Sequence, residues 1–223
     1  EEFLLKLSKG ELIGSFGLSE PGHGSDPASM QTRHTIDGDH YIINGSKMWI
    51  GNAPFCDIAL VWSKSANDSY ACFIIQRNDP GFSTSKIDKK WSFRASETGE
   101  LIFDNCKVHK KYLLFESDSI NAALKSLNIA RYAVACGSIG IAMECYDVAL
   151  KYADERIQFG KKISSNQLIQ KKLVDMITEI TTAQLLNWKL GMMMNDGDAT
   201  FEQISMAKRN NVSVAYNVAR NAR

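Results

Sequence analysis

Two kinds of hydrophobic pattern divide the chain. From residue 11 to about 112, short apolar runs alternate with polar pieces that contain Gly or Pro, which is typical of β-strands joined by turns. The strand-like runs lie at 57–62, 70–76 and 100–108, and turns are predicted at 37–38 (Asp-Gly) and 78–81 (NDPG). Short strands at this spacing predict a small antiparallel barrel or sandwich.

Beyond about Ser119 the apolar residues recur at helical spacing. The pattern predicts one long helix that ends near Arg156, a second helix over 166–194, and a third helix whose N-cap is Asp198 or Thr200. All three are too apolar for helices that lie alone on a surface. We therefore expect other helices beside them, either from a further segment of the chain or from partner chains.

Both ends of the chain lie inside helical patterns. The chain opens on EEFLLKLSKG, a helix with Gly10 as its stop, does not begin with Met, and closes on VAYNVARNAR without a cap. These ends are interpreted as those of an internal segment of a longer protein.

Composition excludes several classes of function. The apolar content is 44%, the charged content 23% and the net charge +1, so neither a nucleic-acid partner nor a membrane surface is expected. The five cysteines include no CxxC pair, which argues against a disulfide framework and against a zinc site; no metal is expected. No apolar run is interpreted as long enough to span a membrane.

The stretch FGLSEPGHGSDP at 16–27 is the most unusual piece of the β region. It contains three glycines and two prolines, and it fits neither the G-x-G-x-x-G nor the P-loop pattern. By itself it is interpreted as a solvated loop between strands, with nothing in it able to pack a core.

Five motifs follow one another along the chain and carry a more specific signal. They are FGLSEPGHGSDP (16–27), NGSKMWIGNA (44–53), RASETGELIFDNCKV (94–108), NIARYAVACGSIG (128–140) and ERIQFGKKISSNQLIQKKLVDM (155–176). In this order they closely resemble the acyl-CoA dehydrogenase family of flavoproteins, and within it the glutaryl-CoA dehydrogenases. The resemblance implies an α+β fold: the end of an N-terminal helical domain (1–10), an antiparallel β middle domain (11–117) and part of a C-terminal helical bundle (118–223).

The resemblance also implies an FAD site. Its residues are Phe16, Leu18, Ser19, Ser25, Trp49, Ile50 and Gly51 in the β region and Arg156, Gln158, Phe159 and Gln167 in the helical region. Trp49, which alone would be interpreted as a core residue, is implied to shield the flavin. The family has Thr or Ser at position 51, with a hydroxyl that meets flavin N5, so Gly51 departs from the pattern.

The same resemblance implies which residues contact the substrate and which contact a partner subunit. Ser25, Asn128 and Arg131 match residues that contact the CoA thioester arm, and Arg131 lies on an otherwise apolar helix face, where a buried arginine needs a partner. Arg156 and Gln158 match residues that reach the FAD of a partner subunit, which implies a homodimer or homotetramer. Taken alone, Arg156 is equally a helix C-terminal charge.

The implied activity is α,β-dehydrogenation of an acyl-CoA, with loss of CO2 for a glutaryl substrate and transfer of electrons to an electron-transfer flavoprotein. The usual catalytic glutamate is expected beyond Arg223, and the position that a few relatives use instead is Ala130. Glu20 and Asp26 are interpreted as structural, so no catalytic residue is assigned in this chain. A truncated non-catalytic homologue that binds flavin, acyl-CoA or partner chains is the alternative, and an acyl-CoA oxidase is a lesser one. The expected location is the cytoplasm of a bacterium or archaeon, or the mitochondrial matrix of a eukaryote.

Overall fold

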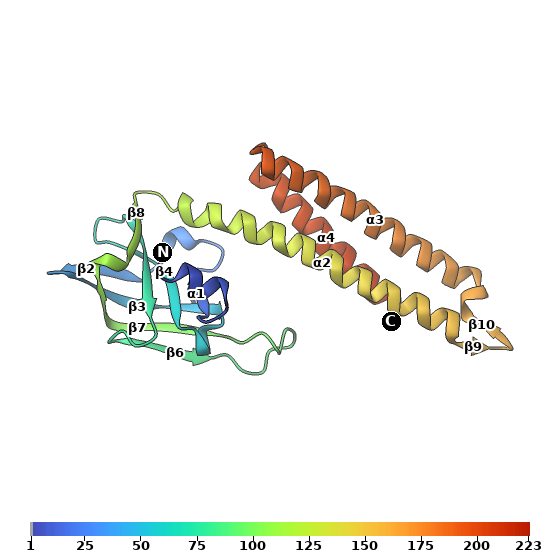
Figure 1. Ribbon diagram of the computed structural model, residues 1–223, viewed down its shortest axis with the longest axis horizontal. Coiled ribbons are helices and arrows are strands. Elements are labelled where there is room, and N and C mark those ends of the chain that lie inside the picture. Colours follow the sequence, from blue (N-terminus) through green and yellow to red (C-terminus); the bar gives the residue numbers. More distant parts are fainter. Residues whose placement is uncertain (1) are drawn as a thin grey trace. The chain divides into compact units, whose positions relative to one another are not determined.

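The computed structural model describes residues 2–223, which form two compact units that divide between Ala123 and Leu124. Figure 1 shows the first as a sheet with the short helix α1 (Leu4–Ser8) and the second as a set of long helices. Helix α1 ends just before Gly10, whose φ of +71° is the left-handed conformation that terminates helices. The helical start and its glycine stop are as the sequence predicts.

The β unit is one sheet of eight strands. They are β1 (Gly14–Gly17), β2 (Arg33–Asp37), β3 (His40–Gly51), β4 (Ile58–Lys64), β5 (Tyr70–Gln76), β6 (Phe82–Lys86), β7 (Thr98–His109) and β8 (Leu113–Ser117). Along the sheet the order is β6-β7-β3-β2-β4-β5-β8, with β1 beside β4. The runs predicted as strands and the two turns are confirmed, as is the mostly antiparallel pairing.

The sheet differs from the expected barrel or sandwich in two respects. It is open, with β6 and β8 at the two ends of the path, and β4 has parallel partners. Strand β1 pairs in parallel with residues 58–61 of β4, and β2 pairs in parallel at Lys64, so β1 and β2 share one edge of β4. This pairing joins segments far apart in sequence, and no local pattern encodes it.

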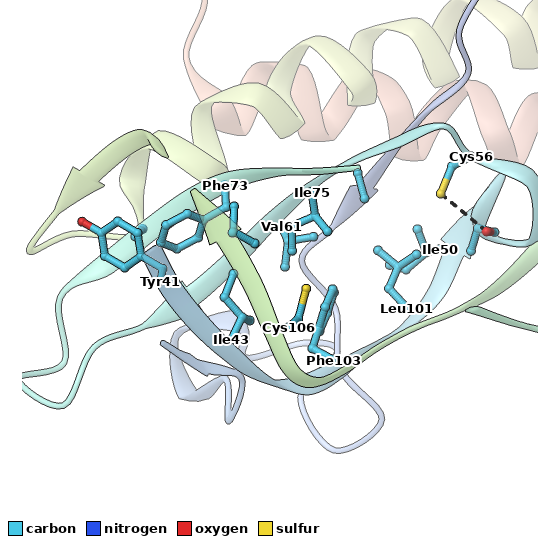
Figure 2. Close-up of a cluster of buried hydrophobic side chains, with 14 residues drawn as sticks. Tyr41, Ile43, Ile50, Cys56, Val61, Phe73, Ile75, Leu101, Phe103 and Cys106 are labelled. Carbon is cyan, nitrogen blue, oxygen red and sulfur yellow. Dashed lines mark hydrogen bonds between the residues drawn. The ribbon is translucent and has the colours of Figure 1, made fainter. Parts of the chain in front are cut away.

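The hydrophobic core of the β unit lies on one face of the curled sheet. In Figure 2 the side chains of Ile43, Val61, Phe73, Leu101 and their neighbours point toward one another from β3, β4, β5 and β7. These four side chains are all fully buried. Because burial of one such side chain contributes roughly 1.5–3 kcal/mol, this cluster fixes the register of the strands that carry the site.

The helical unit contains three long helices and a small hairpin. They are α2 (Asn121–Glu155), α3 (Gln167–Asp196) and α4 (Phe201–Ala222), with β9 (Ile157–Gln158) and β10 (Lys161–Lys162) between α2 and α3. Thr200 is the N-cap of α4, and a reciprocal capping box joins it to Gln203. The three predicted helices are thus confirmed, with Thr200 rather than Asp198 as the cap.

The three helices pack through small and aliphatic residues and one polar contact. Ile139 of α2, Ile180 of α3 and Val218 of α4 belong to one buried cluster. Next to it, the buried Asn211 side chain donates to Asn187 Oδ1 at 2.7 Å and to the Ala135 carbonyl at 3.3 Å. Because a buried amide loses stability without its partners, this contact favours one alignment of the helices.

Helix α2 corrects one expectation from the sequence. Within residues 2–223 it alone is long and apolar enough to cross a membrane, with a mean hydropathy of 1.4 over its most apolar window. The sequence pattern, by contrast, predicts no apolar run of that length. Length and composition are weak evidence for a membrane span, and α2 packs Ala135, Ile139 and Ala142 against the other helices of the unit.

Candidate functional site

The segment that follows β1 lies against β3. The Ser19 carbonyl accepts a hydrogen bond from the Met48 N–H at 2.9 Å. Leu18 is only 5% exposed and Glu20 is equally buried, whereas Phe16 and Ser19 are half-buried. The expectation that nothing in this stretch packs inside the protein is therefore wrong. The chain from Phe16 to Glu20 is an ordered extension of β1, and only the part after it is an exposed loop.

Glu20 is held by a buried lysine. Lys47 of β3 lies 2.9 Å from the Glu20 carboxylate, and Glu20 also accepts from the backbone N–H groups of Gln31 and Thr32. Burial lowers the pKa of Lys47 to about 8, in spite of its partner. Burial alone would raise the pKa of Glu20, but the hydrogen bonds from Gln31 and Lys47 outweigh it and hold this pKa below the usual range.

Trp49 lies on a β-bulge and not in the core. Between the pairs Lys47–Leu101 and Ile50–Gly99, strand β3 has one residue more than β7. Trp49 takes up the extra length with φ +65°, an uncommon conformation for a bulky side chain. The residue is 59% exposed. Strained backbone that holds an aromatic side chain in solvent is characteristic of ligand sites.

The two residues after Trp49 differ in what they offer a ligand. Ile50 is buried, as is Leu18 of the preceding segment, so contacts from either residue to a ligand would come from the main chain. Gly51 is exposed, its φ is not positive, and a Cβ added there would meet no atom within 4 Å. A side chain at position 51 would therefore enter open space next to Trp49.

Ser25 lies in the exposed part of the loop, apart from the contacts of Leu18 and Ser19. After it, the Asp26 carboxylate accepts a hydrogen bond of 2.5 Å from the Ser29 hydroxyl, across the turn Pro27–Ser29. That hydrogen bond lowers the pKa of Asp26. The carboxylate thus orders the turn, in agreement with its structural interpretation.

In the helical unit, Asn128 and Arg131 lie together near the start of α2. The Arg131 guanidinium donates to Asn128 Oδ1 at 2.7 Å, which gives the half-buried arginine a polar partner. Arg131 also lines a cavity of about 410 Å³ with Lys208 and Arg209 of α4. Three cations around one cavity favour an anionic ligand.

The remaining predicted residues lie at the opposite end of α2. Arg156 follows its last turn, Gln158 is in the β9–β10 hairpin, and Gln167 begins α3. Phe159 at the hairpin tip is fully exposed, with φ +51°. Arg131 and Arg156 are roughly 25 residues apart, which along a helix is about 37 Å. The structure therefore separates the residues of this unit into two groups.

Known protein families match both units of the chain. The family model described as the acyl-CoA dehydrogenase middle domain matches residues 15–106, and the one described as the acyl-CoA dehydrogenase C-terminal domain matches residues 120–223. The chain belongs to the acyl-CoA dehydrogenase family. The family consists of FAD-dependent oxidoreductases, and both the resemblance and the fold class expected from the sequence are confirmed.

Among curated acyl-CoA dehydrogenases, the glutaryl-CoA dehydrogenase of Desulfococcus multivorans is 39% identical over 203 residues, which is 88% of this chain and 52% of that protein. A crystal structure of the glutaryl-CoA dehydrogenase from Mycobacterium smegmatis matches with a TM-score of 0.95 at 41% identity, over 99% of this chain and 57% of that one. A glutaryl-CoA dehydrogenase from the same organism in complex with FADH2 matches with the same TM-score at 38% identity and the same coverage. The chain thus spans just over half the length of these relatives.

Sequence reasoning missed three charged residues that lie close to candidate site residues, namely Lys47, Lys208 and Arg209. Lys47 lies in a strand directly before the apolar run Met48–Ile50, and a lysine in that position was a usable signal. Lys208 and Arg209 look in sequence like an ordinary solvated pair on a helix. Only the packing of α4 against α2 places them beside Arg131.

Proposed function

We propose that the full-length protein is an FAD-dependent acyl-CoA dehydrogenase that acts on glutaryl-CoA, with release of CO2, and passes electrons to an electron-transfer flavoprotein. The observation that carries the proposal is the exposed Trp49, held by a strained bulge beside open Gly51 and the main chain of Ser19. The similarity to glutaryl-CoA dehydrogenases supports the choice of substrate.

The residues present fit FAD. Leu18, Ser19 and Ile50 would offer main-chain groups to the polar edge of the flavin, and Trp49 an aromatic surface. The exposed guanidinium of Arg156 suits a diphosphate, since its planar fork donates two parallel hydrogen bonds. When bound, FAD would supply the oxidising power as the acceptor of a hydride, one proton with two electrons, from the substrate.

The distance between the two groups of site residues in the helical unit supports an oligomer. Arg131 and Arg156 lie too far apart along the helix to bind the same part of one ligand. We propose that Asn128 and Arg131 serve the acyl-CoA of their own subunit, and that Arg156, Gln158, Phe159 and Gln167 serve the FAD of a partner subunit in a dimer or tetramer.

The chain's own residues would bind, orient and shield. The indole of Trp49 would cover the flavin, and Ser25 with Asn128 and Arg131 would hold the thioester arm. A thioester α-proton is removed only by a positioned base in a water-poor site. We expect that base to be a glutamate in a segment that follows Arg223, since Ala130 carries no carboxylate.

The direct test is purification of the full-length protein and assay with glutaryl-CoA, butyryl-CoA and isovaleryl-CoA. A visible flavin absorbance band, and faster reduction of an electron-transfer flavoprotein with glutaryl-CoA than with the other two, are expected. Preference for another acyl-CoA would overturn the substrate. Reduction of oxygen in place of the acceptor protein would indicate an oxidase, and protein without flavin or activity would indicate a non-catalytic homologue.

Arg156→Ala is expected to weaken FAD binding by about 10- to 150-fold, which corresponds to about 1.5–3 kcal/mol for hydrogen bonds to a charged group. FAD retained on gel filtration and titration of the apoprotein measure the loss. Arg156→Lys keeps the charge but not the planar fork, so its FAD affinity should lie between that of Arg156→Ala and that of the unmodified protein. Thermal stability of the apoprotein should change little. Equal losses of stability and FAD binding would assign Arg156 to the end of α2 instead.

Gly51→Thr is expected to raise the rate of flavin reduction about fivefold, since one restored hydrogen bond is worth about 1 kcal/mol. The position tolerates the change because φ is not positive and the added side chain meets open space. Stopped-flow reduction and substrate titration separate rate from affinity. Gly51→Ala is the control without a hydroxyl and should behave like the unmodified protein. A change in acyl-CoA affinity alone would show that position 51 does not face the flavin.

A further inference from the structure

A complete polar cluster lies beneath the surface that carries Ser19 and Trp49. At its centre is Lys47, which has no exposed surface although it is charged. Its Nζ donates to the Leu18 carbonyl at 3.1 Å and to Glu20 Oε1 at 2.9 Å, and lies 3.8 Å from Met30 Sδ. One side chain of β3 therefore holds both a main-chain group and a side chain of the segment that follows β1.

Glu20 uses both carboxylate oxygens. Oε1 accepts from the Thr32 N–H at 2.9 Å and the Thr32 hydroxyl at 2.6 Å, and Oε2 accepts from the Gln31 N–H at 2.6 Å. The residues on the two sides of the exposed loop, Glu20 before it and Thr32 after it, are thus joined at one carboxylate. The loop that contains Ser25 begins and ends at this point.

Stability alone gives a poor account of this cluster. Removing two charges from water costs about as much as their attraction returns, so an apolar pair of similar volume is often equally stable or more so. An apolar side chain at position 47, however, could not hold the Leu18 carbonyl. The ionic cluster adds a fixed position for the main chain on each side of Ser19. The Ser19 carbonyl between them is held by the Met48 N–H, from the strand that also carries Lys47.

We propose that Lys47 and Glu20 are positioning residues that fix the main chain of Leu18–Glu20 against β3, so that Ser19 and Trp49 meet the flavin and the acyl thioester in one geometry. Lys47 is two residues from Trp49, and Glu20 is next to Ser19, so the pair joins the two segments directly. This inference rests on the proposed function. Neither residue touches the reacting atoms.

The test compares the full-length holoenzyme with the double variant Lys47→Met/Glu20→Gln. This variant removes both charges and keeps the shape of the Glu20 side chain. Its one amide oxygen can accept from Thr32 or from Gln31 but not from both, and the Leu18 carbonyl is freed. The matched control is Lys86→Met/Glu97→Gln, which makes the same changes at a lysine–glutamate pair of equal length, 2.9 Å, at the sheet surface. Thermal unfolding, the flavin absorbance spectrum, and stopped-flow reduction with glutaryl-CoA under FAD saturation are measured for each.

The double variant should fold, with a thermal midpoint closer to that of the unmodified enzyme than the midpoint of Lys47→Met alone. It should show a shifted flavin spectrum and reduce its flavin at least tenfold more slowly at saturating substrate. The control should change none of these. An unchanged spectrum and rate would overturn the proposal, as would a variant that cannot fold, since the pair would then serve stability. If the unmodified enzyme itself lacks flavin, the proposed function is wrong, and this inference fails with it.

Discussion

Lys47→Met alone is expected to lower the free energy of unfolding by about 3–5 kcal/mol, the usual cost of leaving one member of a buried ion pair without its partner. Glu20 would remain buried with its carboxylate facing a thioether, and it would lose one of the hydrogen bonds that hold its pKa low. Chemical denaturation of the full-length apoprotein at neutral pH measures the change.

Addition of Glu20→Gln to Lys47→Met should restore part of this loss, because no uncompensated charge then remains inside the protein, although the amide oxygen can accept from only one of Gln31 and Thr32. Lys86→Met, at an exposed ion pair of the same sheet, should have no measurable effect. If the single and double variants were equally unstable, the loss would come from packing around position 47, and the charge argument would be wrong.

Acidification from pH 6.5 to pH 4 is expected to cost about 3 kcal/mol of stability through His34. This imidazole is buried between Tyr41 and Phe73 and shares a hydrogen bond of 2.9 Å with the Ser63 hydroxyl. Burial, with a smaller contribution from Arg33, lowers its pKa to about 4. Between pH 6.5 and 4 the unfolded chain therefore binds a proton that the folded chain does not, and stability falls as the pH falls.

Denaturation curves of the unmodified protein and of His34→Gln, recorded at pH 7 and pH 4.5, measure this effect. His34→Gln should lose much less stability on acidification. Ser63→Ala is the matched control: it removes the hydrogen bond but keeps the imidazole, so it should lower stability at both pH values and retain the pH dependence. Equal acid sensitivity of His34→Gln and the unmodified protein would show that other groups control the acid response.

Most of the long elements and the family could be predicted from local sequence patterns. The periods of its apolar residues predicted the strand at 70–76 and the three long helices, and Asp198 or Thr200 marked the start of the last helix, which the structure places at Thr200. These signals are local, since periodicity, glycine stops and caps depend on residues a few positions apart. The ordered motifs were specific enough for the family because five matches in sequence rarely arise together.

Tertiary structure decided what each site residue presents. Sequence alone favours Trp49 as a core residue. Trp49 is exposed because β3 has one residue more than β7 at this point, which forms a bulge. Leu18 and Ile50 belong to the same motifs but are buried. Sequence reasoning gave no partner for Lys47, since Glu20 lies 27 residues away. Contacts between such distant residues depend on strand pairing, which the chain reaches only through the packing of the whole core, and no local pattern records them.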